Sequence, residues 1–191
     1  MALNDDAVIT PAVGHILTAD PGTPNPSALE IDGFDPEEGF VDWENLGHTS
    51  RDELPEFGFE GGDTEVRGTW QNASLRTVTT EAPVDSVVFQ LHEMTAAGLS
   101  LYYGPNVQVA DGELVVPDTP VDAVKRALLI VIRDGSTSIA FYAPHCDIRR
   151  EEAVGMDIDG FMTLPIRATF LKSGSDPLYK WISNDTLADG S

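Results

Sequence analysis

The sequence predicts a mainly β protein with one packed α-helix, folded as a β-sandwich or a partly closed barrel. Three observations predict this fold class. From residue 65 onward, short runs rich in Val, Ile, Thr and aromatic residues alternate with turn residues, as strands do. Asp-Gly pairs at residues 111–112 and 134–135 lie between apolar runs and indicate β-hairpins. In the middle of the chain, only residues 96–103 have the boundary signals of a helix.

The first forty residues are expected to form an extended arm rather than part of a core. Residues 20–39 contain four of the 13 prolines and several glycines, a composition that favours turns over regular elements. Before them, residues 7–17 have the composition of a short strand that Pro11 interrupts. The predicted division is an N-terminal arm at residues 1–40, a β-sandwich domain at residues 41–183 and a flexible tail at residues 184–191.

Three strands and the helix are expected between residues 65 and 104. The strands are predicted at residues 65–71, 74–80 and 86–93. In the third strand, Val87, Phe89 and Leu91 fall on one face, because side chains alternate along a strand. Thr95 is placed to cap a helix over residues 96–103, and Gly104 is placed to end it in a left-handed conformation.

The second half of the chain repeats the strand pattern, with hairpins expected at residues 106–116 and 127–143. The unbroken apolar run from Leu128 to Ile132 predicts a strand that is covered on both faces. Pro165 interrupts the next expected strand and indicates a sheet edge or a bulge there. Asp176 and Pro177 are expected to begin a short terminal helix, with proline in its first position.

The chain is strongly acidic, and its charge is unevenly distributed. It contains 11 Lys and Arg against 32 Asp and Glu, for a net charge of −21, and Arg51 is the only base before residue 67. Binding to nucleic acid or to an anionic membrane is disfavoured, because both surfaces require clustered bases. High solubility is a further consequence of such a charge.

No pattern of catalytic or metal-binding residues is found. The four histidines are scattered without a helical partner, and the Gly-x-Ser-x-Gly and phosphate-loop motifs are absent. His145, Cys146 and Asp147 alternate between the faces of a strand, so they cannot converge on one metal ion. The single cysteine excludes an internal disulfide, and the acidic N-terminus is unlike a secretory signal. We therefore expect no enzyme, no cofactor and no metal site.

The segment at residues 34–66 has the pattern of neither a helix face nor a strand core. Its aromatic residues Phe40, Trp43, Phe57 and Phe59 stand singly among turn residues and acids. Such side chains require an outside surface to cover them, which indicates assembly with another chain rather than catalysis.

Several segments, taken in order, resemble the major tail proteins of long-tailed phages, the tail-tube subunits, especially those of phages that infect actinobacteria. The matching segments are DWENLGHTSRDELPEFGFEGGD, GTWQNASLRT, VDSVVFQLHEMTAAGLSLYYG and the late pair ALLIVIRDGSTSIAFYAP and GFMTLPIRATFL. They extend from residue 42 to residue 171, and their order and spacing carry the resemblance.

The resemblance implies the tail-tube type of β-sandwich and a structural virion protein that is made in the host cytoplasm. Copies would form stacked, hexameric rings and so a hollow tube for DNA ejection, through which DNA passes without specific binding. The implied partners are the chain itself, the tape-measure protein and the tail terminator and baseplate proteins, with no membrane. Acidic side chains are then expected to line the lumen and to repel the passing DNA.

Within this interpretation, residues 34–66 are expected to reach the neighbouring ring, and an exposed strand edge at Pro165 is expected to help close the ring. The candidate contact residues are Trp43, Leu46, Arg51, Phe57, Phe59 and Pro165. The alternative functions are a capsid decoration protein, another acidic β-sandwich binding module, such as one for carbohydrate, and an acidic inhibitor that mimics DNA.

Overall fold

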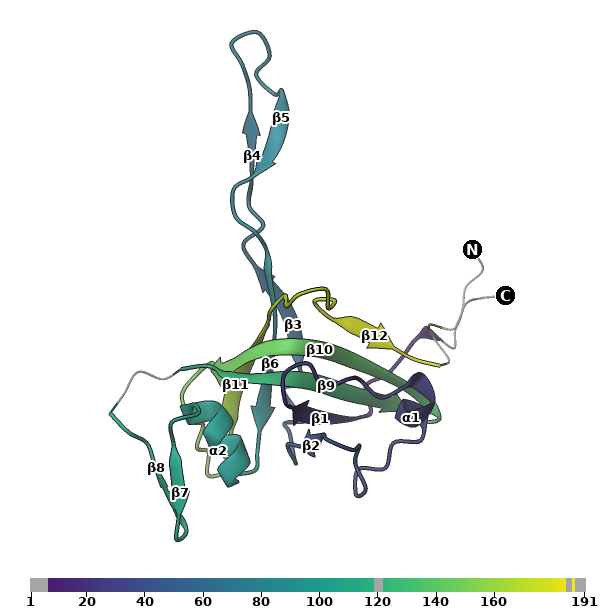
Figure 1. The fold of residues 1–191 in the computed structure, drawn as a ribbon, viewed down its shortest axis with the longest axis vertical. Coiled ribbons are helices and arrows are strands. Elements are labelled where there is room, and N and C mark those ends of the chain that lie inside the picture. Colours follow the sequence, from purple (N-terminus) through teal and green to yellow (C-terminus); the bar gives the residue numbers. More distant parts are fainter. Residues whose placement is uncertain (1–6, 119–121, 185–186, 188–191) are drawn as a thin grey trace.

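The computed structural model describes residues 7–118, 122–184 and 187. Its body is an antiparallel sheet of eight strands in the order β2-β1-β9-β10-β11-β6-β3, with β12 paired beside β10 (Figure 1). The strands are β1 (Val13–Ala19), β2 (Glu44–Asn45), β3 (Glu56–Glu60), β6 (Val84–Leu91), β9 (Val124–Asp134), β10 (Thr137–Arg150), β11 (Leu164–Phe170) and β12 (Lys180–Ile182). The sheet does not close into a barrel, since β2 and β3 are edge strands within the described part of the chain. The prediction of a mainly β fold is confirmed.

The hairpin of β9 and β10 forms the centre of the sheet and is covered on both faces. Asp134 pairs with Thr137 across its turn, where Gly135 has a φ of 61°. Along β9, Leu128 and Ile130 belong to one hydrophobic cluster, whereas Ala127, Leu129 and Val131 belong to a second cluster on the opposite face. The sequence prediction of a doubly covered strand is therefore confirmed.

Each face of the sheet is covered by one helix. On the first face, α2 (Ala96–Tyr103) packs Leu101 and Tyr102 against β10 and β11. On the opposite face, called here the α1 face, α1 (Ala28–Asp32) contributes the buried Ile31 to the second cluster. This cover lies over β1, β9 and the first half of β10 only, because the residues of the second cluster come from these strands and from the chain around α1.

The helix α2 begins and ends where the sequence predicts. The Thr95 side chain accepts a hydrogen bond of 3.2 Å from the Gly98 N–H and so caps the first turn. Gly104 ends the helix with a φ of 96°, which a residue with a side chain rarely adopts, although its ψ of 174° is extended rather than left-handed helical.

Residues 13–34 differ from the extended arm that the composition indicates. The strand β1 pairs with β9 over its whole length, and Ile16 and Leu17 are buried. Ser27 and Glu30 form a capping box that starts α1 in spite of the surrounding prolines. This part of the chain completes the sheet and covers its α1 face, so it belongs to the folded body. Residues 1–6, 185–186 and 188–191 of the two expected terminal segments lie outside the described residues.

Pro165 lies in the interior strand β11, not at an edge of the sheet, so the edge prediction is wrong. Its neighbours are β6, where it pairs with Gln90, and the end of β10. Proline is accepted there because the ladder between β10 and β11 ends at Arg150, after which the Pro165 carbonyl accepts only the Glu151 N–H. The irregularity that proline causes occurs instead in β10, between Ala143 and Cys146, where Pro144 removes a donor.

The segment after Pro177 forms β12 rather than the expected terminal helix. The strand β11 pairs with β10 only from Cys146 to Arg150, so the edge of β10 before the bulge is open, and β12 pairs there with Ala140–Tyr142. The ring of Trp181 then packs against Phe141 at 5.1 Å between centroids. This tertiary pairing overrides the local helix signal.

Two hairpins project from the body in opposite directions (Figure 1). The strands β4 (Thr64–Arg67) and β5 (Arg76–Thr79) continue β3 and β6 into a long projection, residues 61–83. This projection is called the arm from here on and is distinct from the N-terminal arm expected at residues 1–40. The strands β7 (Gln108–Ala110) and β8 (Glu113–Val115) form the shorter hairpin, and the predicted Asp111-Gly112 turn joins them. The described residues contain no helix of the length and hydrophobicity that crossing a membrane requires.

Candidate assembly surfaces

Two of the predicted contact residues, Trp43 and Leu46, are buried in their own subunit. Only 8% of Trp43 and 5% of Leu46 is exposed. The Trp43 ring packs edge-on against Tyr142, and its Nε1–H donates to the Pro24 carbonyl at 3.3 Å. Leu46 belongs to the cluster on the α2 face and donates its N–H to the Ile16 carbonyl. In the single subunit these two side chains face the core and present no surface to a partner.

Phe57, Phe59 and Arg51 are accessible, although Phe57 has partners in its own chain. The Phe57 ring lies 4.7 Å from Phe141 and 5.4 Å from Trp181, and 38% of the residue is exposed. Phe59 is 73% exposed and Arg51 is exposed as well. Arg51 lines an open cavity of about 620 Å³ between β1 and the loop before β3. Pro165, the sixth candidate, is buried.

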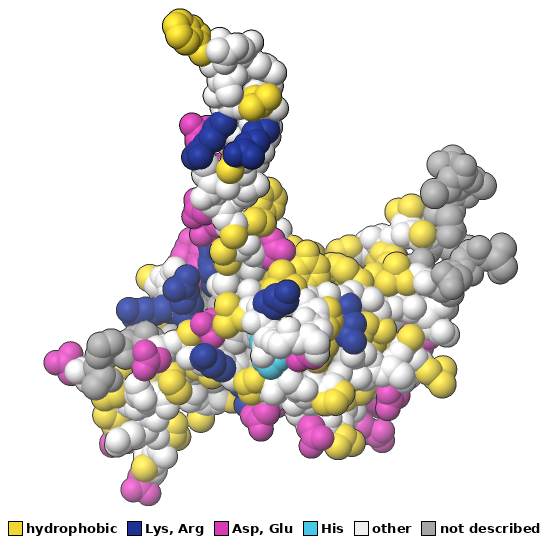
Figure 2. Space-filling model, turned by 45° about the horizontal axis from the view of Figure 1, so that its top comes forward, with side chains coloured by type: hydrophobic (Ala, Val, Ile, Leu, Met, Phe, Trp, Pro, Cys, Tyr) yellow, Lys and Arg dark blue, Asp and Glu magenta, His cyan; other side chains and the backbone are white. Residues whose placement is uncertain are grey.

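The arm is the most exposed part of the described chain, and the sequence interpretation did not single it out. Its tip is a closed turn in which Thr69 and Asn72 exchange backbone hydrogen bonds of 2.7 and 3.1 Å. Trp70 is the first of the two residues between them and is 100% exposed. Figure 2 shows a hydrophobic side chain at the end of the arm and basic side chains on its shaft.

The basic side chains of the arm are Arg67 and Arg76, which are paired directly across β4 and β5. Arg67 forms an ion pair of 3.2 Å with Glu65, and both side chains are more than half exposed. The Arg76 side chain makes no hydrogen bond or ion pair with any residue that the structure describes. A sequence signal for this region exists, because residues 66–80 contain two bases and no acid in a chain with a net charge of −21.

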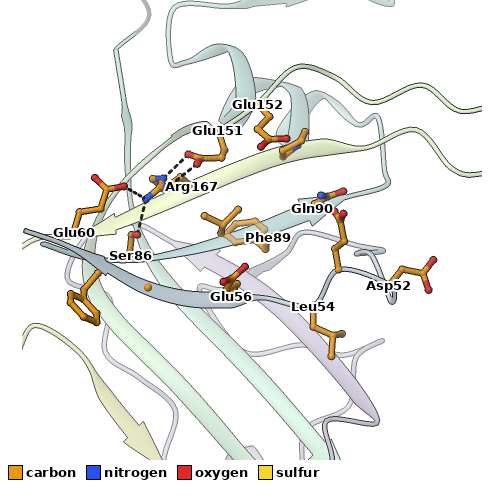
Figure 3. Close-up of a pocket in the computed structure, with 15 residues that line it drawn as sticks. Asp52, Leu54, Glu56, Glu60, Ser86, Phe89, Gln90, Glu151, Glu152 and Arg167 are labelled. Carbon is orange, nitrogen blue, oxygen red and sulfur yellow. Dashed lines mark hydrogen bonds and ion pairs between the residues drawn. The ribbon is translucent and has the colours of Figure 1, made fainter.

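The open part of the α1 face carries a groove of about 760 Å³ over β3, β6 and β11 (Figure 3). Pro165 and Val88 lie in its lining, and acidic side chains dominate the rest. These acids are Asp52, Glu53, Glu56, Glu60, Glu151 and Glu152.

Among the described residues, Arg167 is the only base that lines the groove, and it pairs with two carboxylates at one end of the groove. Its guanidinium donates two hydrogen bonds of 2.5 Å to Glu151, one of 3.1 Å to Glu60 and one of 3.1 Å to the Ser86 hydroxyl. The hydrogen bonds that Arg167 donates to Glu151 lower the pKa of Glu151 and raise the pKa of Arg167. The other four carboxylates form no ion pair with any described residue.

Besides β12, which pairs with β10 alone among the described strands, the strand order ends in two edges of different length. At one end β2 has only two residues, and at the other end β3 has five, all of them exposed. Exposed edges of this kind accept a strand from another chain unless something covers them. The sequence placed such an edge at Pro165, whereas the structure places it at β3, which contains Phe57 and Phe59.

The described residues contain no group of three His, Cys, Asp or Glu side chains that is placed to hold a metal ion. Cys146 is buried in the core, and this burial raises its pKa to about 12, so its thiol stays protonated at neutral pH. The prominent surfaces are therefore an exposed arm, an acidic groove and an open sheet edge, all suited to contacts between chains.

Comparison with known proteins agrees with this arrangement. Residues 1–190 match the family described as "Phage tail tube protein". The chain is 44% identical over 190 residues to the major tail protein Gp23 of Mycobacterium phage D29, with 97% of this chain and 95% of the relative covered. It is 42% identical over 190 residues to the major tail protein Gp23 of Mycobacterium phage L5, with the same coverage. The chain therefore belongs to the phage tail tube protein family.

Proposed function

We propose that this chain is the structural subunit of a phage tail tube, in which copies close into hexameric rings and the rings stack into a hollow tube for DNA ejection. The protein is then located in the tail of the virion. The observation that carries the proposal is the arm, which extends far from its own body and ends in a fully exposed tryptophan (Figure 1). A fully exposed tryptophan contributes no burial energy in the free monomer. It contributes binding energy when a second chain buries it.

Ring closure is assigned to the edges of the sheet. A ring requires a head-to-tail contact between two different patches of the same chain. The β2 and β3 edges lie at opposite ends of the strand order, so a β3 edge is able to meet the β2 side of the next copy. Phe57 and Phe59 on β3 and Arg51 in the preceding loop are the predicted residues that remain accessible for this contact.

Stacking is assigned to the arm, residues 61–83, instead of the whole segment at residues 34–66. Trp43 and Leu46 are taken up by the core of the subunit, so they support the body and do not touch the next ring. Trp70 takes the role of aromatic anchor that the sequence interpretation gave to Trp43. The tape-measure, terminator and baseplate proteins are the further partners that we propose, and acids on the inner wall repel the passing DNA at close approach.

Electron microscopy of the purified chain tests this function. We expect concentrated protein at moderate salt to form rings and hollow tubes of uniform width, whereas dilute protein at low salt remains monomeric. Fragments of tube, added as seeds, should speed the conversion if nucleation is slow. Folded protein that stays monomeric at every concentration and salt, with seeds present, would overturn the proposal.

A further inference from the structure

We propose that the arm of one subunit lies in the acidic groove over β3, β6 and β11 of a subunit in the adjoining ring, with Arg67 and Arg76 against the groove carboxylates. This inference rests on the proposed stacking of rings and goes beyond it by naming the surface that receives the arm. Three features support this inference: the charge of the arm, the open face of the sheet, and the directions in which the arm and the groove run.

The charge of the arm is unfavourable in the isolated subunit. Arg67 and Arg76 are directly opposite each other on β4 and β5, and like charges in this position destabilise a hairpin. The nearby Glu65 forms an ion pair with Arg67 alone, and Arg76 has no partner within the described part of the chain. An acidic surface on a second chain would remove this repulsion and would satisfy both guanidinium groups.

The acids of the arm, Asp63, Glu65 and Glu81, lie near its base, and its outer part, residues 66–80, contains two bases and no acid. The acidic groove is therefore opposite in charge to the outer part of the arm, and it lies on a face that the subunit itself leaves open. The α1 face is covered by α1 and its flanking chain over β1 and β9, but this cover does not extend over β11, β6 and β3. Arg167 holds Glu60 and Glu151 at the end near the arm. Four carboxylates remain without a cation that contacts them: Asp52, Glu53, Glu56 and Glu152. Arg149 on β10 adds only a through-space attraction to Glu151.

The arm and the groove agree in direction and in length. The groove runs from Glu60, at the base of the arm, along β3 to Asp52 in the preceding loop at the far end (Figure 3). The arm continues the axis of β3 beyond the body (Figure 1), so an arm that arrives from an adjoining ring meets the far end of the groove first. At about 3.3 Å per residue, the nine residues from Glu60 to Thr69 reach about 30 Å, close to the extended length of residues 52–60.

A second acidic surface, the β7–β8 hairpin with Asp111 and Glu113, is the competing position for the arm. It projects away from the body (Figure 1), and its two carboxylates stand on a thin, exposed ribbon. The groove offers twice as many free carboxylates around a concave surface, where partial exclusion of water strengthens each ion pair. We therefore place the arm in the groove.

Charge reversal tests the contact. The arm variant carries Arg67→Glu and Arg76→Glu, and the groove variant carries Glu56→Arg and Glu152→Arg, all at exposed positions. At fixed moderate salt, we expect each variant alone to remain folded and to raise the critical concentration for tubes by about tenfold or more. The chain with all four substitutions should form tubes again. An equimolar mixture of the two variants should do so as well, because each reversed surface then meets its complement in the adjoining ring.

A matched control separates this contact from an effect of net charge. The groove variant combined with Lys125→Glu and Lys172→Glu has the same net charge as the four-substitution chain, but its arm is unchanged, so we expect no rescue. Tube formation by either single variant at the wild-type concentration would overturn the inference. Rescue of the arm variant by Asp111→Arg and Glu113→Arg, with no rescue by the groove substitutions, would assign the arm to the β7–β8 hairpin instead. If the wild-type chain forms no tubes, it is the proposed function that fails.

Discussion

Two tryptophans show how the environment of a single residue separates folding from assembly. Trp43 is buried against Tyr142, whereas Trp70 stands fully exposed on a closed turn. We expect Trp43→Ala to lower the free energy of unfolding by about 3–5 kcal/mol, as large-to-small core substitutions do. Trp70→Ala should change it by less than about 0.5 kcal/mol, yet weaken tube formation. Urea denaturation of the monomer and sedimentation of tubes measure the two effects. Wild-type tube formation by Trp70→Ala would exclude the tip from the contact.

Arg167 is the residue whose removal should change the pH dependence of stability. Its hydrogen bonds lower the pKa of Glu151 below the ordinary value of 4.5. The unfolded chain therefore takes up the proton first, so this contribution is complete above pH 4.5 and is lost as the pH falls through the lowered value. We expect Arg167→Met to lower the free energy of unfolding at pH 7 by about 1–3 kcal/mol, because it leaves two carboxylates without their donor.

Denaturation curves at several pH values check this prediction. The difference between wild type and Arg167→Met should shrink as the pH falls from 6 toward 3. Arg149→Met is the matched control, since Arg149 is exposed and acts on Glu151 only through space. Equal pH profiles for wild type and Arg167→Met would show that the ion pair contributes no net stability.

At the scale of the elements, the sequence correctly predicted those helices and strands whose conformation depends on neighbouring residues. The cap at Thr95, the β9–β10 hairpin and the doubly covered run in β9 depend on a few neighbouring residues, and all are confirmed. The proline-rich N-terminal segment and β12 were mispredicted, because pairing with distant strands decides their conformation. Trp43 and Leu46 are buried in their own subunit, whereas Phe57 and Phe59 stay accessible, because an isolated apolar residue gives no indication of whether its own core or another chain covers it.

The arm should be removable without loss of the body. Glu60 and Val84 are already paired at its base, so Asn-Gly in place of residues 61–83 would join β3 and β6 by a two-residue turn. The residues of the arm make no contribution to either core cluster. We therefore expect a folded chain with unchanged cooperative unfolding that forms at most single rings. Circular dichroism and electron microscopy measure these outcomes, and regular tubes from the shortened chain would exclude the arm as the stacking element.

The two ends of the whole molecule differ along its longest axis. The arm lies at one end, and the β7–β8 hairpin lies on the side away from it (Figure 1). We propose that subunits with different ends stack along this axis, and because this stacking repeats along a line instead of closing into a ring, it builds a filament of any length. The proposed ring contact and the proposed stacking contact must therefore use separate surfaces. The edge strands and the arm meet this requirement within one chain.

Net charge sets the conditions under which the filament grows. In the proposed hexameric ring, six copies of a chain with a net charge of −21 carry −126. The repulsion between these charges acts over distances set by the Debye length, about 30 Å at 0.01 M salt and about 10 Å at 0.1 M. Contacts between an arginine and a carboxylate act at a few ångströms and are weakened only when the Debye length approaches about 3 Å, near 1 M.

We therefore expect the critical concentration for tubes to fall steeply from 0.01 M to 0.1 M NaCl and to rise again near 1 M. Sedimentation across this range measures it, with Arg67→Glu and Arg76→Glu as the comparison. Removal of the arm cations should abolish the rise near 1 M and leave the fall at low salt, because the repulsion between subunits remains. A critical concentration that is independent of salt would show that neither the repulsion nor the ion pairs control assembly.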